Sequence, residues 1–207
     1  MARRAGAPEV NAGSMADIAF LLLIFFLVTT TIETDAGLDR MLPPMEPPTE
    51  EPPIIKQKNI FTVNINRNGQ LLVEDEILPI SKLREKAIAF LDNGGAPQGS
   101  PDYCSYCKGK RISESSDNPA KAIISLKNDR ETKYSTYITV QNELVGAYND
   151  LRNRESKRLF GKDYVEMEAE YLNPETDDSV KDELKEKVTR IQSLYPQKLS
   201  EAETSTE

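Results

Sequence analysis

Histidine and tryptophan are missing from this chain of 207 residues, and cysteine occurs only twice. Without histidine there is no imidazole metal ligand and no histidine-based catalytic triad. Cations are in the minority, with 26 Lys and Arg against 34 Asp and Glu. Because binding to nucleic-acid phosphates needs clustered Lys and Arg, this balance argues against a nucleic-acid partner. No nucleophile–base pair or metal-ligand cluster supports an enzyme, so we expect no catalytic activity, no cofactor and no metal.

Long apolar runs are equally scarce, because there is only one, over residues 10–32, and it contains a single acid, Asp17. As a helix, about 23 residues extend roughly 34 Å, enough to cross roughly 30 Å of hydrocarbon. An Asp inside a span costs about 3 kcal/mol on insertion scales, whereas the apolar residues 18–28 return about 4–5 kcal/mol. We therefore predict a transmembrane helix over 10–32 in spite of the acid.

Asp17 is the main candidate functional residue, because an ionisable group inside a span indicates an ion path or a proton relay. A helical wheel places it on a weakly polar stripe that suits a protein partner better than lipid. The stripe consists of Asn11, Ser14, Asp17, Leu21, Ile24 and Val28. The alternative is an Asp that snorkels to the cytoplasmic interface and has no role.

The sequence from Asp17 to Thr29, DIAFLLLIFFLVT, resembles the transmembrane signature of the ExbD/TolR family. The resemblance implies a bacterial inner-membrane subunit of a motor driven by the proton motive force, with Asp17 as proton carrier. It implies three partners, namely an ExbB/TolQ-like polytopic membrane pentamer, a second copy of the chain, and a TonB-like protein. It does not separate an ExbD-like role in TonB-dependent transport from a TolR-like role in envelope integrity. The rival interpretation is a membrane-tethered periplasmic interaction domain, in which Asp17 has no proton role.

The charges around the apolar run predict its orientation. Arg3 and Arg4 lie in the leader 1–9, whereas acids dominate just after the run. Since positive charge stays in the cytoplasm, we expect a single-pass protein with a cytoplasmic N-terminus and a periplasmic C-terminal domain. A cleaved signal peptide is the alternative, but Asp17 would then interrupt its apolar region.

A linker is predicted over 33–58, because its paired prolines favour an extended, semi-rigid chain. An ExbD/TolR-like α+β domain is expected over 59–160. It begins with an alternating strand near residues 61–65, followed by the hairpin dipeptide Asn68-Gly69 and a return strand. Ser81 is expected to cap the next helix. The apolar face of that helix consists of Leu83, Ala87, Phe90 and Leu91.

An insertion is predicted over 93–119, where Gly, Pro and Ser are frequent and both cysteines lie. In an oxidising compartment the pair Cys104 and Cys107 favours a local disulfide. Three alternatives stay open: a zinc site, which would need two further ligands, a thioredoxin-type redox pair, and two free thiols.

The remainder alternates between strand and helix patterns. A short strand is expected over 122–126, and a helix over about 134–154. The helix should pack on the sheet through Tyr137, Val140, Leu144, Tyr148 and Leu151. A C-terminal helical extension is expected over 161–200, with an amphipathic helix from Val180 that ends at Tyr195-Pro196. Residues 163–171 fit helix and strand equally well, residues 198–200 could pair as a late strand, and residues 201–207 are expected to be a disordered tail.

Overall fold

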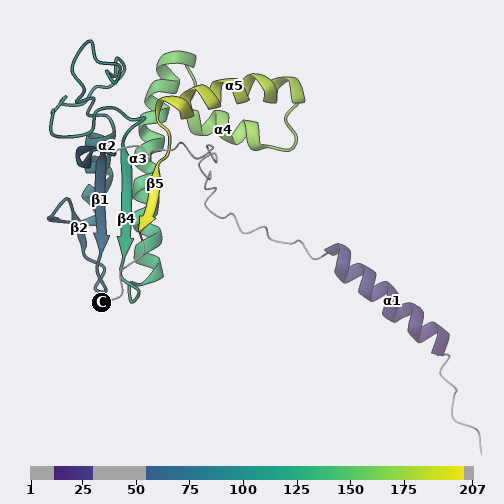
Figure 1. Ribbon diagram of the computed structural model, residues 1–207. Coiled ribbons are helices and arrows are strands. Elements are labelled where there is room, and N and C mark those ends of the chain that lie inside the picture. The colour runs from purple at the N-terminus through teal and green to yellow at the C-terminus, as the bar shows by residue number, and fades with distance from the viewer. Residues whose placement is uncertain (1–11, 30–54, 203–207) are drawn as a thin grey trace, which may run out of the picture. The chain divides into compact units, whose positions relative to one another are not determined.

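The computed structural model describes residues 12–29 and 55–202 (Figure 1). Its contacts divide the chain into two units, residues 1–52 and residues 53–207, which are described separately. The first unit contributes one helix, α1, over Ala12–Thr29. Among residues 12–29 and 55–202, no helix combines the length and apolarity needed to cross a membrane. Residues 10, 11 and 30–32 of the predicted span lie outside the described residues.

A five-stranded mixed sheet organises the second unit, with the strand order β3-β2-β1-β4-β5. The strands are β1 (Ile60–Ile65), β2 (Leu71–Val73), β3 (Glu76–Leu78), β4 (Ile123–Asn128) and β5 (Leu199–Ala202). The first three form an antiparallel meander, whereas β4 pairs in parallel with both β1 and β5. The mixed α+β class predicted from the sequence is therefore confirmed.

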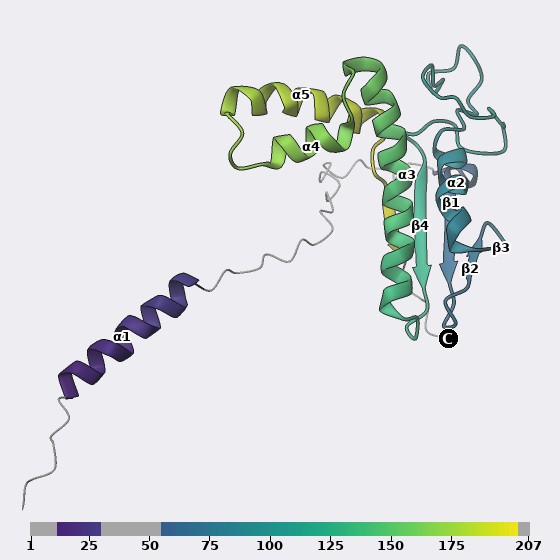
Figure 2. The ribbon, with the colours of Figure 1, turned by 180° about the vertical axis from the view of Figure 1, so that it is seen from behind.

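Two helices, α2 (Ile80–Leu91) and α3 (Tyr134–Phe160), cover one face of the sheet (Figure 2). Alternate residues of β1 and β4 point towards these helices and are buried, as strand geometry requires. The four apolar residues predicted for the face of α2 are all buried, and so are Val140, Leu144, Tyr148 and Leu151 of α3. Tyr137 is partly buried against the same core, so the predicted packing of this helix on the sheet is confirmed.

A helical hairpin separates α3 from the last strand. It consists of α4 (Tyr164–Leu172) and α5 (Asp178–Leu194), and it extends to one side of the sheet in Figures 1 and 2. The hairpin has its own small apolar core, made by Tyr164, Met167, Leu184, Val188 and Ile191. The chain then returns to the sheet, where Ile124 of β4 pairs with Leu199 of β5.

Several sequence-based expectations need correction. Ser81 is not the cap of α2, because the helix already begins at Ile80 after Pro79, whose fixed φ suits a helix start. Helix α3, predicted to end near Arg154, continues six residues further to Phe160 and ends where Gly161 adopts a positive φ of 72°. Residues 163–171, which fitted helix and strand equally, form most of α4.

Three further differences concern short segments. Strand β3 was not predicted, because three residues are too few for a visible period. Glu201 and Ala202 belong to β5 instead of a disordered tail, and residues 203–207 lie outside the described residues. Within the predicted linker, residues 57 and 58 belong to a short 3-10 helix over Gln57–Asn59, whereas residues 33–54 lie outside the described part of the chain.

Candidate functional site

Asp17 occupies the sixth position of α1 and is the only ionisable residue in that helix. Ala, Leu and Met favour the helical conformation, and proline is absent from this segment, so the backbone is locally consistent with a helix. The large apolar side chains of residues 15–26 in α1 are exposed, including Phe20, Leu23 and Phe26. A helix that is apolar all round finds its partners in lipid or in other protein chains.

The structure describes only part of the predicted stripe around Asp17. Asp17, Leu21 and Ile24 are exposed in α1. Ser14 and Val28 belong to the same helix, but the structure describes only their backbone. Asn11 lies outside the described residues. Since an isolated helix offers no protein-lined path for an ion, the carboxylate of Asp17 can act as a relay only with a partner chain around it.

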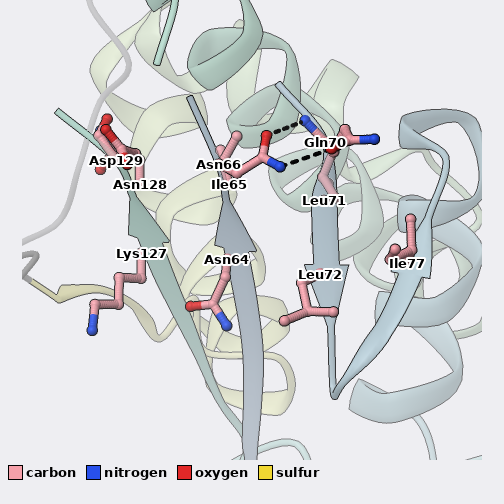
Figure 3. A pocket seen from close by; sticks show the side chains of 10 residues that line it. All are labelled: Asn64, Ile65, Asn66, Gln70, Leu71, Leu72, Ile77, Lys127, Asn128 and Asp129. Carbon is pink, nitrogen blue, oxygen red and sulfur yellow. Dashed lines mark hydrogen bonds between the residues drawn. The ribbon is translucent and has the colours of Figure 1, made fainter. Parts of the chain in front are cut away.

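The face of the sheet opposite α2 and α3 carries a second candidate site, an open groove of about 510 Å³ (Figure 3). It lies over the ends of β1, β2 and β4, and its side chains alternate with those that fill the core. Its lining combines amides, one cation, one acid and aliphatic groups, and includes Asn64, Asn66, Gln70, Leu72, Ile77, Lys127 and Asp129. Ile77 is 73% exposed, so the groove presents an apolar edge to solvent.

Asn66 fixes the turn that borders this groove. Its Oδ1 accepts hydrogen bonds from the backbone N–H groups of Asn68 (3.0 Å) and Gln70 (2.9 Å). Its Nδ2 donates to Oε1 of Gln70 at 2.9 Å (Figure 3). Gly69 has a φ of 77°, which the predicted Asn-Gly turn requires. The amides, the charged ends of Lys127 and Asp129, and the aliphatic groups of this groove are the mixture of groups that a protein docking surface offers.

A buried ionic cluster joins segments that are distant in the sequence. Arg154 of α3 donates two hydrogen bonds to the carboxylate of Asp92, at 2.6 and 2.8 Å, and Tyr195 donates a third at 2.7 Å. Glu155 is fully buried and accepts hydrogen bonds from Arg154 (3.2 Å) and Arg158 (2.6 Å). The hydrogen bonds from Arg154 to Asp92 raise the pKa of the Arg154 guanidinium, so this cation stays charged. Burial and the neighbouring Asp92 raise the pKa of the Tyr195 phenol, which keeps it a donor.

A second buried acid, Asp117, anchors the end of the insertion to the start of β1. Lys58 Nζ lies 2.5 Å from Asp117 Oδ1, and Asn59 donates to its Oδ2 at 3.3 Å. Burial works against ionisation, but the hydrogen bonds from Lys58 and Asn59 outweigh it, so the pKa of Asp117 is lowered. Neither cluster was foreseen, because the side chains that bind Asp92 and Asp117 are 58 to 103 positions away from them in the sequence.

The insertion places Cys104 and Cys107 side by side, and their sulfurs form a disulfide. Both residues are buried, with 2% and 5% of their surface exposed. Within residues 12–29 and 55–202, no group of three or more His, Cys, Asp or Glu side chains could hold a metal ion.

Comparison with protein families gives a match. A family model described as "Biopolymer transport protein ExbD/TolR" matches residues 3–152, which include Asp17, the four strands β1–β4 and most of α3. The α4–α5 hairpin and β5 lie beyond the matched region. A search of curated proteins finds no match.

Proposed function

Since this chain belongs to the ExbD/TolR family of biopolymer transport proteins, we propose that it uses Asp17 as the proton carrier of a motor that energises TonB-dependent transport. Members of the family are non-enzymatic subunits of transport motors, and the chain is such a subunit. The observation that carries the proposal is the position of Asp17. It is the one ionisable side chain in an 18-residue helix that is otherwise mostly apolar, and it lies inside the matched region.

The membrane location follows from the same segment. We propose that residues 10–32, of which α1 comprises 12–29, cross the bacterial inner membrane once. An apolar segment of about 20 residues is the length that a bilayer requires. Arg3 and Arg4 on one side and the acids on the other orient the N-terminus to the cytoplasm and the second unit to the periplasm.

The mechanism needs partner chains. Family membership points to an ExbB/TolQ-like polytopic pentamer and a TonB-like protein as partners, with a second copy of this chain beside it. The pentamer would line two half-channels, one to each side of the membrane, and Asp17 would take a proton from one and release it to the other. Each charge that crosses the membrane supplies about 2.3 kcal/mol per 100 mV, so a strong pull on a partner needs several protons.

Two other functions use the same chain differently. In a TolR-like envelope motor Asp17 keeps its role, but the work maintains the outer membrane. In a tethered interaction domain, α1 is only an anchor and the groove over β1, β2 and β4 is the working surface. Asp17 separates the tether from both motors, because an anchor is not weakened by the loss of its only charge.

The decisive experiment compares wild type, Asp17→Asn and Asp17→Glu at matched membrane abundance, in cells whose growth requires energised outer-membrane uptake. Asp17→Asn keeps the size of the side chain and removes the titratable proton, whereas Asp17→Glu keeps the carboxylate. The proposal expects no growth with Asn, partial growth with Glu, and copurification of both variants with a polytopic membrane partner. Normal growth of Asp17→Asn would reject it for uptake. Detergent sensitivity of that variant would then support the TolR-like motor, and detergent resistance would support the tether.

A further inference from the structure

The insertion and the α4–α5 hairpin meet at one aromatic side chain. Tyr106 lies between the two cysteines, and its hydroxyl donates to the carbonyl oxygen of Leu194, the last residue of α5, at 2.8 Å. Its ring packs edge-to-face on Tyr195, with 5.5 Å between ring centres. The insertion therefore contacts the chain at Leu194 and Tyr195, where it leaves the hairpin and turns towards β5.

The disulfide fixes the position of Tyr106. The four-residue ring closed by Cys104 and Cys107 holds its backbone, and the N–H of Cys107 donates to Cys104 Sγ at 3.1 Å. Arg111 donates to the carbonyl oxygens of both cysteines, at 3.2 and 3.3 Å, and covers the ring of Tyr103. Gly94 packs closely against one side of the ring, because a Cβ added to it would lie 2.8 Å from Cys107 Cβ.

Tyr195 and the insertion also bind Asp92 of the buried ionic cluster. Tyr195 donates to Asp92 through its hydroxyl, and its carbonyl oxygen accepts two hydrogen bonds from Arg152, at 3.0 and 2.9 Å. On the insertion side, the N–H of Lys108 donates to Oδ2 of the same Asp92 at 3.2 Å. Burial, with Glu155 and Asp92 nearby, raises the pKa of Tyr106 to about 12, so the phenol keeps its proton at neutral pH.

We infer that the Cys104–Cys107 disulfide is a redox-sensitive latch, which through Tyr106 fixes the exit of the α4–α5 hairpin and the approach to β5. A dithiol reductant opens it. The S–S bond accepts two electrons and two protons, two Cys thiols form, and the reductant closes to a cyclic disulfide. Two thiols need van der Waals separation, and both cysteines are buried, with Cys107 Cβ packed against Gly94. The backbone of 104–107 therefore shifts, and Tyr106 leaves Leu194. The latch concerns the second unit alone and does not depend on the role of Asp17.

The test is hydrogen exchange of the full chain in detergent micelles, with and without dithiothreitol. Reduction is expected to raise amide exchange over residues 191–202 about tenfold, the effect of one lost hydrogen bond to an ordered segment. Exchange over 134–151, in the part of α3 that packs on the sheet, should not change. The Cys104→Ser/Cys107→Ser double variant should exchange like the reduced protein and should not respond to dithiothreitol.

Two tyrosine variants separate the latch from general loosening of the insertion. Tyr106→Phe, with the disulfide intact, should raise exchange over 191–202, because it removes only the hydroxyl that holds Leu194. Tyr103→Phe is the matched control and should leave that segment unchanged. The inference fails if reduction affects only residues 100–112, if Tyr106→Phe has no effect on 191–202, or if dithiothreitol leaves the bond intact in the folded protein.

Discussion

Arg154 holds both carboxylate oxygens of Asp92, with Nη1 2.6 Å from Oδ2 and Nη2 2.8 Å from Oδ1, although the residues are 62 positions apart. Asp92 ends α2 and is only 4% exposed. The same carboxylate also accepts hydrogen bonds from the insertion and from Tyr195. This one side chain therefore connects the family domain, the insertion and the helical hairpin.

Arg154→Leu should destabilise the second unit by about 3–5 kcal/mol, because it leaves the buried charge of Asp92 without its main partner. The measurement is urea unfolding of the full chain, followed by the near-ultraviolet circular dichroism of its tyrosines. Arg67→Ala is the control, since Arg67 and Glu131 form an exposed pair 3.7 Å apart, which should contribute at most about 1 kcal/mol. Equal losses in the two variants would contradict the bridging role of Asp92.

Acid should weaken the attachment of the insertion through Asp117. Because its pKa is lower in the folded state than in the unfolded state, this contribution is fully present above about pH 5 and is lost as the pH falls through about 4 and below. Asp117→Asn should remove about 1–3 kcal/mol at neutral pH and flatten the acid limb of the stability curve. Urea midpoints measured between neutral and acidic pH test this, and parallel curves for wild type and variant would contradict it.

Gly109→Ala should displace the insertion from the end of α2. A Cβ at this position would lie 2.4 Å from the backbone oxygen of Asp92, which cannot move aside as a side chain can. We expect a loss of about 1–3 kcal/mol in thermal or urea unfolding, as for other overpacked sites. Ser105→Ala, an exposed position in the same loop, provides the baseline. A neutral Gly109→Ala variant would mean that this contact is absent in solution.

Ser81→Ala should change stability by no more than about 0.5 kcal/mol, because Ser81 lies inside α2 and makes no capping hydrogen bond. Loss of a true N-cap would cost about 1 kcal/mol. Urea unfolding distinguishes the two values, and Leu83→Ala, which truncates a fully buried side chain of the same helix, calibrates the scale at about 2–5 kcal/mol.

Periodicity was the reliable guide to the core. The faces of α2 and α3 could be predicted residue by residue, because both helices bury a continuous apolar stripe against the sheet. The hairpin at Asn68-Gly69 could also be predicted from local sequence, because glycine there tolerates the positive φ that the turn needs.

The links between segments could not be predicted. Asp, Arg and Tyr are residue types that are common at the surface and in turns, and only the fold brings Asp92, Arg154 and Tyr195 together. For β5 the sequence indicated only that residues 198–200 could pair as a late strand, because Ser200 and Glu201 gain their strand character from pairing with β4. For Asp17 the limit is different. Its proton chemistry depends on partner chains that surround α1, and the sequence of this chain does not contain the residues of those partners.

The return of the chain from the hairpin to the sheet has a consequence for changes of length in the hairpin. Leu199 joins β4 beside Ile124 after a detour through α4 and α5, and each of these helices packs mainly on the other. The entropy of closing such a loop grows only with the logarithm of its length, by about 0.6 kcal/mol per doubling. Changes of length within residues 161–194 are therefore expected to leave the strand order undisturbed.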